Sequence, residues 1–174
     1  MTRFRTLLLT AGGLGHAPVA SGTFGSLPPV VLALLMAFLG QPVWLITLVM
    51  LLVAVVFSVA CIRFGDEAET RFGRKDPGQV VADEVAGQAL ALSFLPWADP
   101  SISGAAWQNL LLGVGAFLAF RFFDILKPPP ASSLESLKGG LGILVDDLIT
   151  GLMALVVVQV ITRGLLGWQS IPMS

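Results

Sequence analysis

The residues of this sequence that could do chemistry are mainly carboxylates, several of them inside or beside apolar runs. These acids are Asp76, Asp83, Glu84, Asp124, Asp146 and Asp147. Oxygen ligands suit a hard divalent cation, so Mg²⁺ is the expected ion and Mn²⁺ the alternative. The chain has one cysteine, Cys61, and one histidine, His16. A disulfide framework, a cysteine-rich metal site and chemistry that needs two histidines are therefore excluded.

Two glycine-rich stretches stand beside groups that could hold an oxyanion. Ser21 to Ser26 offers hydroxyls, and Lys138 precedes Gly139 and Gly140. Glycine lets the backbone approach a ligand closely, and lysine neutralises phosphate oxygens. The candidate phosphate or head-group contacts are His16, Ser21, Gly22, Thr23, Lys127, Lys138, Gly139 and Gly140. Together with the carboxylates, they predict a metal-assisted phosphate site.

Most of these motifs also have a plainer interpretation. Ser26 could simply cap a membrane helix that starts near Leu27, with two prolines in its first turn. Arg121, Asp124 and Lys127 stand three residues apart and share a helix face, so they could form a local ion pair at the membrane surface. His16 is either a group near the substrate or an ordinary polar loop residue. The adjacent aspartates at 146 and 147 have the fewest structural explanations, because acids inside a membrane segment are costly.

Helix geometry leads to two expectations about the acids. Neighbours on a helix point about 100° apart, so Asp83 and Glu84 are expected to flank a site rather than to serve one point. Gly87 stands four residues after Asp83, and Gly151 four after Asp147. A glycine on the same face as each acid would let another helix pack closely beside it.

The elements that must position these residues are membrane helices. Of the 174 residues, 55% are hydrophobic and only 12% are charged, against about 25% charged in an ordinary soluble domain. This composition excludes a disordered chain and a nucleic-acid-binding module. A spanning helix needs roughly 20 mostly apolar residues. The candidates are Thr23 to Leu39, Val43 to Ile62, Val80 to Pro96, Ala105 to Leu126 and Leu141 to Leu166, the first and third of marginal length.

Charge asymmetry predicts the orientation of these spans. With five crossings, nine of the ten basic residues fall at one end of the bundle, and Arg163 alone falls at the other. Basic residues collect on the cytoplasmic side, so the N-terminus is expected inside the cell. Ten of the eleven acids lie at that same end, and Asp99 is the exception. If Val80 to Pro96 were re-entrant, the later segments would flip, but the charge count argues against this.

The fold predicted from these observations is an all-α integral membrane protein, a small bundle of about five transmembrane helices forming one domain over residues 1–174. Acids from three separate helices are expected to converge at the cytoplasmic ends of those helices. A small transporter or channel is a rival interpretation, but it calls for acids on both halves of the bundle. A non-catalytic assembly protein is another, but it has no need of a lysine, a glycine turn and paired aspartates together.

Four motifs follow one another in a recognisable order. They are His16-Ala17-Pro18 with Ser21-Gly22-Thr23-Phe24-Gly25-Ser26; Asp76-Pro77 with Val81 and Asp83-Glu84; Phe123-Asp124-Ile125-Leu126-Lys127-Pro128; and Lys138-Gly139-Gly140-Leu141-Gly142-Ile143 with Asp146-Asp147. In this order the chain closely resembles the phosphatidylglycerophosphatase A family, from about His16 to Gly151. One departure is visible, because Gln79 stands where relatives are expected to carry an acid.

The resemblance implies a Mg²⁺-dependent lipid phosphatase of phospholipid biosynthesis in the bacterial inner membrane. Such enzymes hydrolyse the phosphomonoester of phosphatidylglycerophosphate to phosphatidylglycerol at the cytoplasmic face. The expected partner is therefore a phospholipid, with no nucleic acid and no obligate protein partner. The resemblance also implies that the motif acids and lysines form the site.

Roles within that site follow as hypotheses. The expected catalytic residues are Asp83, Asp147, Lys127 and Lys138, and the expected metal ligands are Asp76, Asp83, Glu84, Asp124, Asp146 and Asp147. Either a water oriented by a carboxylate or a carboxylate itself could attack phosphorus. Other phosphatase designs are excluded: Glu67 stands where a cysteine phosphatase would carry arginine after Cys61, and no Asp-x-Asp pattern occurs.

Overall fold

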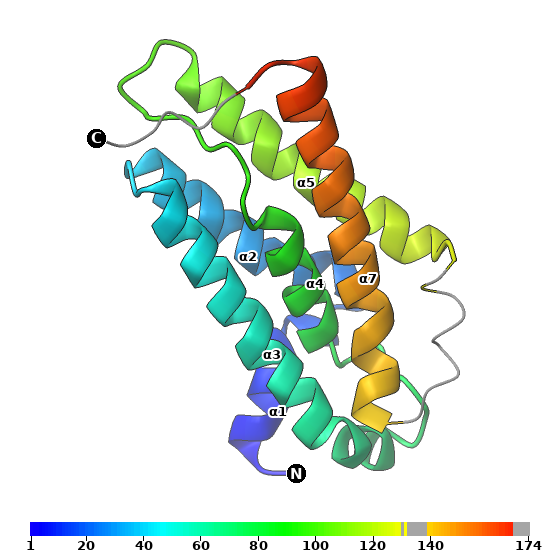
Figure 1. Cartoon of the computed structure of the whole chain (residues 1–174). Coiled ribbons are helices and arrows are strands. Elements are labelled where there is room, and N and C mark those ends of the chain that lie inside the picture. The colour runs from blue at the N-terminus through cyan, green and yellow to red at the C-terminus, as the bar shows by residue number, and fades with distance from the viewer. Residues whose placement is uncertain (130, 132–138, 169–174) are drawn as a thin grey trace.

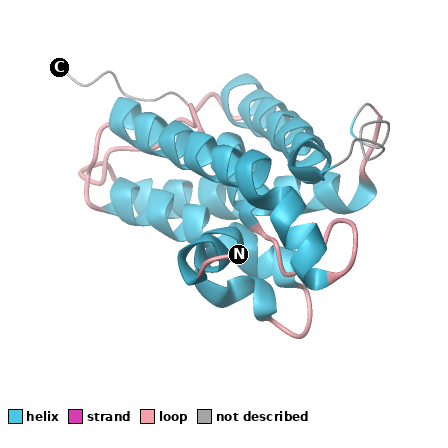
Figure 2. Cartoon of the chain, turned by 90° about the horizontal axis from the view of Figure 1, so that it is seen from below, coloured by secondary structure: helices cyan, strands magenta, loops and turns pink. Residues whose placement is uncertain are grey.

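The protein is an assembly of helices in the part that the structure, a computed structural model, describes: residues 1–129, 131 and 139–168. Figures 1 and 2 show helices joined by turns, with no strand in those residues. The elements are α1 (Arg3–Leu9), η1 (Ala11–His16), α2 (Ser21–Phe38), α3 (Val43–Phe72), α4 (Ala82–Leu92), α5 (Ala105–Leu126), α7 (Gly139–Gln159) and η2 (Val160–Leu165). The predicted all-helical membrane fold is thereby confirmed.

Four helical segments among the described residues are long and apolar enough to cross a membrane: α2, α3, α5, and α7 continued by η2. Many large apolar side chains on their outer faces are exposed, such as Val55, Leu118 and Leu152. Such a surface suits a lipid environment rather than water, because it leaves large apolar side chains without protein cover. The chain is therefore a multi-pass membrane protein by length and composition.

The prediction that the third candidate span, Val80 to Pro96, is a complete helix is wrong. Only Ala82–Leu92 is helical there, and 11 residues are too few to cross a membrane. Figure 1 shows that the chain nevertheless continues beyond α4 as an extended strand of backbone toward the far end of the bundle. A Cβ atom on Gly40 would lie 3.8 Å from Pro100, so the loop after α2 and the loop before α5 meet at that end. The segment thus crosses the bundle, and the predicted directions of α5 and α7 are preserved.

Side chains of neighbouring helices form hydrogen bonds with the backbone of the extended segment that follows α4. Asn109 of α5 accepts a hydrogen bond from the Ala98 N–H at 2.8 Å and donates one to the Ala98 carbonyl at 3.0 Å. The Phe94 N–H donates to the Thr47 hydroxyl of α3 at 3.2 Å. Backbone without helical hydrogen bonds is tolerated at membrane depth only where protein or water satisfies it. These hydrogen bonds explain how the short helix α4, followed by extended backbone, can replace the complete helix that was expected over Val80 to Pro96.

The start of α2 also differs from the sequence prediction. The helix begins at Ser21, so Pro28 and Pro29 lie inside it rather than in its first turn. The Ser26 hydroxyl donates to the Gly22 carbonyl at 2.8 Å and does not cap the helix. The glycine-rich stretch therefore forms the first two turns of α2, and its Gly22 backbone lies against Glu84 of α4.

Helix α4 is the centre of the bundle. Nine of its eleven residues are buried, and Figure 1 shows it between α3 and α7. A Cβ atom on Gly87 would lie 2.5 Å from the Asp147 carbonyl oxygen, and one on Gly151 would collide with the Gly87 carbonyl oxygen. Both glycines are thus required for the close approach of α4 and α7, as their spacing from the acids predicts.

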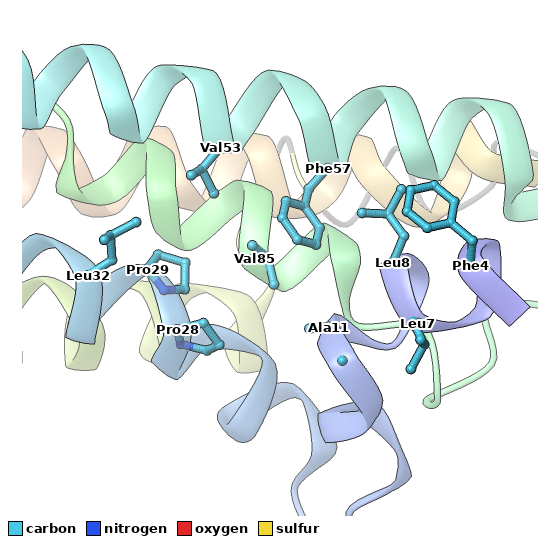
Figure 3. A pocket seen from close by; sticks show the side chains of 11 residues that line it. Phe4, Leu7, Leu8, Ala11, Pro28, Pro29, Leu32, Val53, Phe57 and Val85 are labelled. Atoms are coloured by element: carbon cyan, nitrogen blue, oxygen red, sulfur yellow. The ribbon is translucent and has the colours of Figure 1, made fainter.

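An apolar groove of about 450 Å³ lies on another side of α4 (Figure 3). Its walls come from α1, α2, α3 and α4, and Phe57 and Val85 both line it. Val85 follows Glu84 directly, so α4 presents its carboxylates to one side and an apolar side chain to another. The groove has almost no polar lining and is separate from the acids described next.

Candidate active site

Three carboxylates meet at one point in the bundle. One oxygen atom from each of Asp83, Glu84 and Asp147 lies within 4.8 Å of the other two. Asp83 and Asp147 are buried and Glu84 is half-buried. We call these three residues the acid cluster. The expectation that Asp83 and Glu84 would flank a site rather than serve one point is therefore wrong.

The acid cluster exists because of how its two helices pack. Asp83 and Glu84 occupy the first turn of α4, and Asp147 occupies the third turn of α7. Gly87 and Gly151 bring these helices so close that α7 reaches both α4 acids. The longer side chain of Glu84 offsets its different direction on the helix. Residue spacing within α4 alone could not show this convergence.

Arg121 and Asp124 of α5 border the acid cluster. The Arg121 Nη1 atom lies 2.5 Å from the Asp124 Oδ2 atom, so the predicted local ion pair exists. Asp124 also interacts electrostatically with Glu84 and Asp147, as Arg121 does with Glu84. A fourth carboxylate and one guanidinium are therefore part of the same polar centre.

Gly22 of α2 closes this side of the centre. A Cβ atom on Gly22 would collide with the Glu84 carboxylate and would lie 3.0 Å from the Arg121 Nη1 atom. The first turn of α2 thus contacts both groups directly through backbone. The close approach seen here is to protein side chains, whereas the sequence predicted a close approach to a ligand.

Lys127 and Asp146 form a second polar centre beside the first. The Lys127 Nζ atom donates to the Asp146 Oδ2 atom at 2.6 Å. Both residues line an open pocket of about 230 Å³ together with Lys75, Asp76 and Gly142. We call this the outer pocket. Asp146 and Asp147 are adjacent on α7, so one faces the outer pocket while the other belongs to the acid cluster.

Asp76 belongs to the outer pocket rather than to the acid cluster. It lies in the turn between α3 and α4, and its backbone N–H donates to the Glu69 carboxylate at 3.2 Å. Desolvation raises the pKa of the Asp76 carboxyl, and Asp146 acts in the same direction while Lys127 opposes it. The predicted ligands Asp76 and Asp146 are thus placed next to a lysine, one pocket away from the three acids that meet.

The predicted head-group residues of the N-terminal motif lie at the start of α2. His16 and Ser21 line a polar pocket of about 440 Å³ with Arg74, Gly78 and Gln79. His16 is exposed, and its ring is edge-on to Phe72 with centroids 6.4 Å apart. Thr23 is half-buried in the first turn of α2. Ser21 directly precedes Gly22, so this pocket adjoins the polar centre of Arg121 and Glu84.

Gly139 and Gly140 begin α7 against α3. The Gly140 N–H donates to the Asp66 Oδ1 atom at 3.1 Å, and Gly139 adopts a positive φ of 66°. A side chain on Gly139 would collide with the Asp66 carboxylate. In this structure the two glycines therefore seat the start of α7 on α3. Lys138, the predicted catalytic lysine before them, lies outside the described residues.

The acid cluster fits a divalent cation by its chemistry. The Asp83 Oδ1, Glu84 Oε2 and Asp147 Oδ2 atoms are buried without a hydrogen-bond partner among the described residues. Buried carboxylate oxygens are costly unless they are paired or bind a metal. Three such oxygens from two helices are suited to Mg²⁺ or Mn²⁺.

Sequence reasoning gave no site role to two residues that the structure places in or beside these centres. Arg121 was interpreted only as a surface ion-pair residue, although an arginine within an apolar run is itself a signal. Asp66 carries no such signal, because its role depends on the packing of α3 against α7.

Comparison with known proteins gives a family match. The family model described as Phosphatidylglycerophosphatase A matches residues 7–162, which is most of the chain. The chain belongs to the phosphatidylglycerophosphatase A family. The predicted family resemblance is thereby confirmed, and all residues of the acid cluster lie within the matched range.

Three relatives show how widely the similarity extends. A Haemophilus influenzae protein named Phosphatidylglycerophosphatase A is 36% identical, covering 87% of this chain and 85% of its own. An Escherichia coli protein of the same name is 32% identical, covering 85% of this chain and 77% of its own. A Bacteroides thetaiotaomicron protein with the provisional name phosphatidylinositol-3-phosphatase is 31% identical, covering 88% of this chain and 91% of its own. No solved structure matches the chain.

Proposed function

We propose that this protein is a Mg²⁺-dependent phosphatidylglycerophosphatase, hydrolysing the phosphomonoester of phosphatidylglycerophosphate to phosphatidylglycerol and phosphate. The observation that carries the proposal is the acid cluster, whose three buried oxygens lack partners among the described residues. The family and the names of two relatives support the phosphatase class and this head group. The choice of Mg²⁺ follows from the all-oxygen ligand set.

The residues around the acid cluster divide the expected chemistry between them. Asp83, Glu84 and Asp147 would hold the cation, which supplies charge neutralisation and activation of the attacking oxygen when bound. Asp124 of α5 is paired with Arg121 and adds a fourth carboxylate beside the acid cluster. Lys127, in the outer pocket, would attract the phosphate from the membrane surface.

The reaction is a phosphoryl transfer to water. A water oxygen forms a bond to phosphorus as the bond from phosphorus to the glycerol oxygen breaks. The water gives one proton to a carboxylate, and the glycerol oxygen takes one from the surrounding solvent. We favour direct attack by water over a covalent aspartyl-phosphate, because each acid of the cluster is a candidate ligand. Acid quenching of a reaction with radiolabelled substrate tests this, and a trapped acyl-phosphate would contradict it.

We also propose where the reaction takes place. The described polar centres lie at the end of the bundle that carries Arg5, Arg71 and Arg74. The distribution of basic residues supports a cytoplasmic position for that end. In a bacterium this corresponds to the inner leaflet of the cell inner membrane. The acyl chains would remain in lipid while the head group enters the site. No protein partner or nucleic acid is part of the proposal.

The testing experiment is phosphate release by the purified protein in detergent. The substrates are phosphatidylglycerophosphate and phosphatidylinositol 3-phosphate, each with Mg²⁺ and with a chelator. We expect release from phosphatidylglycerophosphate only when Mg²⁺ is present. Equal release after chelation would contradict the metal assignment, and preference for the inositol lipid would assign the head group suggested by the Bacteroides relative. Ion flux through vesicles without phosphate release would favour a transporter.

A further inference from the structure

We propose that Arg121 is a phosphate-binding catalytic residue, whose guanidinium group holds the reacting phosphoryl group against the acid cluster. This inference rests on the proposed phosphatase function and adds a contact that the sequence motifs did not assign. It concerns the inner of the two polar centres, at the meeting point of α2, α4 and α5.

The position of Arg121 places a cation directly beside the acids. Its side chain is only 16% exposed, and its Nη1 atom lies 2.5 Å from Asp124. A Cβ atom on Gly22 would lie 3.0 Å and 3.2 Å from the two terminal nitrogens of Arg121 and would collide with Glu84. The guanidinium and the Glu84 carboxylate therefore face the same bare stretch of α2 backbone. The absence of a side chain on Gly22 is what lets both groups lie this close to the α2 backbone.

The hydrogen-bonding capacity of Arg121 is only partly used. A guanidinium has five N–H donors in a planar fork that matches two oxygens of a phosphate. The Asp124 contact occupies one edge of this fork. The Arg121 Nε atom is buried with no hydrogen-bond partner in the part of the chain that the structure describes. A buried charged donor without a partner is costly, and a phosphate oxygen would satisfy it.

The described lysines near the acids, Lys75 and Lys127, line the outer pocket instead. Lys127 donates to Asp146 in the outer pocket, which opens toward the surface. A lysine there can attract a phosphate, whereas Arg121 is paired with Asp124 and interacts electrostatically with Glu84 of the acid cluster. The geometry thus divides Lys127 and Arg121 into an outer attracting group and an inner group at the reacting phosphorus.

The role of Arg121 follows from the charge that develops during hydrolysis. As water adds to phosphorus and the glycerol oxygen departs, negative charge remains on the non-bridging phosphate oxygens. Arg121 would donate two hydrogen bonds to those oxygens without gaining or losing a proton itself. Removing one donor of this kind typically costs about 10²- to 10³-fold in rate.

The test combines turnover with two binding measurements on the purified full chain. The variants are Arg121→Gln and Arg121→Lys, with Arg63→Gln as a control that removes the same charge from an exposed position on α3. For each we would measure kcat/KM, binding of inorganic phosphate in the presence of Mg²⁺ by calorimetry, and binding of Mn²⁺ by electron paramagnetic resonance.

We expect Arg121→Gln to lose about 10²-fold or more in kcat/KM and to weaken phosphate binding about tenfold, whereas Mn²⁺ still binds. Arg121→Lys should lose most of the rate, because a lysine cannot replace the two-pronged contact. Arg63→Gln should resemble the unaltered protein. Unchanged phosphate binding in an Arg121 variant that still binds Mn²⁺ would overturn the inference and leave Arg121 as a structural partner of Asp124.

If Arg121→Gln does not fold, the same comparison is made with Arg121→Lys, which retains the positive charge. Failure of the proposed function has a different signature. In that case the unaltered protein would release no phosphate from the lipid, whether or not inorganic phosphate binds in an Arg121-dependent manner.

Discussion

At the scale of single residues, the site depends on buried charge. Asp83 and Asp147 are buried carboxylates with unpartnered oxygens, and Arg121 is a nearly buried cation beside them. Each would be unfavourable alone, because isolated charges are costly away from water. Their meeting in one place, together with the proposed divalent ion, would make each of them tolerable. The chemistry and the stability of this centre are therefore linked.

The residue whose loss should matter most is Asp147. We predict that Asp147→Asn lowers phosphate release more than about 100-fold, since even a group behind a metal ligand is worth about 10- to 100-fold. Asn keeps the size of the side chain, so the protein should still insert in the membrane. Asp99→Asn is the matched control, because Asp99 is an exposed acid in the loop before α5. Near-normal turnover by the Asp147 variant would remove Asp147 from the mechanism.

Some features of these residues could be predicted from the sequence, and others could not. The acids of the cluster were identifiable because acids within apolar runs are rare. Which acids meet was not identifiable, since the approach of Asp83 and Glu84 to one point depends on α7 packing against α4. The separation of Asp146 from Asp147 into two pockets was equally invisible. Asp66 was missed because its contact with Gly140 spans 74 residues of sequence.

At the scale of the elements, α4 is the part that organises the site. It is too short to span, and it stops within the bundle at Leu92. Apolar length alone predicted a complete helix over Val80 to Pro96, because the extended backbone beyond Leu92 is as apolar as a helix would be. The polar partners that permit this, Thr47 and Asn109, come from α3 and α5. Sequence periodicity does not reveal such pairing.

Close packing of α4 on α7 gives a prediction at this scale. We expect Gly87→Ala to lower activity about tenfold or more, because a Cβ atom there would lie 2.5 Å from the Asp147 carbonyl and 2.6 Å from the Phe120 ring. The two helices that carry the acid cluster would have to separate. Turnover and Mn²⁺ affinity should fall together.

The control for this variant is Gly115→Ala on α5, where a Cβ atom would meet nothing within 4 Å. It should leave activity unchanged, because alanine is the better helix former and needs no extra space there. Equal activity of the Gly87 and Gly115 variants would show that the approach of α4 to α7 does not position the acids.

At the scale of the whole molecule, the bundle has two chemically different ends. The end with α1 and the turn between α3 and α4 carries most of the basic residues and the described polar centres. The other end, where the loops around Gly40 and Pro100 meet, carries Asp99 and Arg163. The sequence predicted this asymmetry correctly, because it depends only on the number of crossings and the charges between them.

Orientation in the membrane gives the prediction at this scale. Ser101→Cys should react with a membrane-impermeant maleimide applied to intact cells or spheroplasts, and Thr2→Cys should react only after the membrane is opened. The native Cys61 is fully buried, so it should contribute little background. The opposite labelling pattern would place the site outside the cytoplasm.

The proposed mechanism depends most on a divalent cation bound between α4 and α7. The direct measurement is Mn²⁺ binding to the purified protein by electron paramagnetic resonance, comparing the unaltered chain with the double variant Asp83→Asn, Asp147→Asn. We predict saturable binding that Mg²⁺ displaces in the unaltered protein and at least a tenfold loss of affinity in the variant. Equal Mn²⁺ affinity in both proteins, with the variant folded in detergent, would contradict the account.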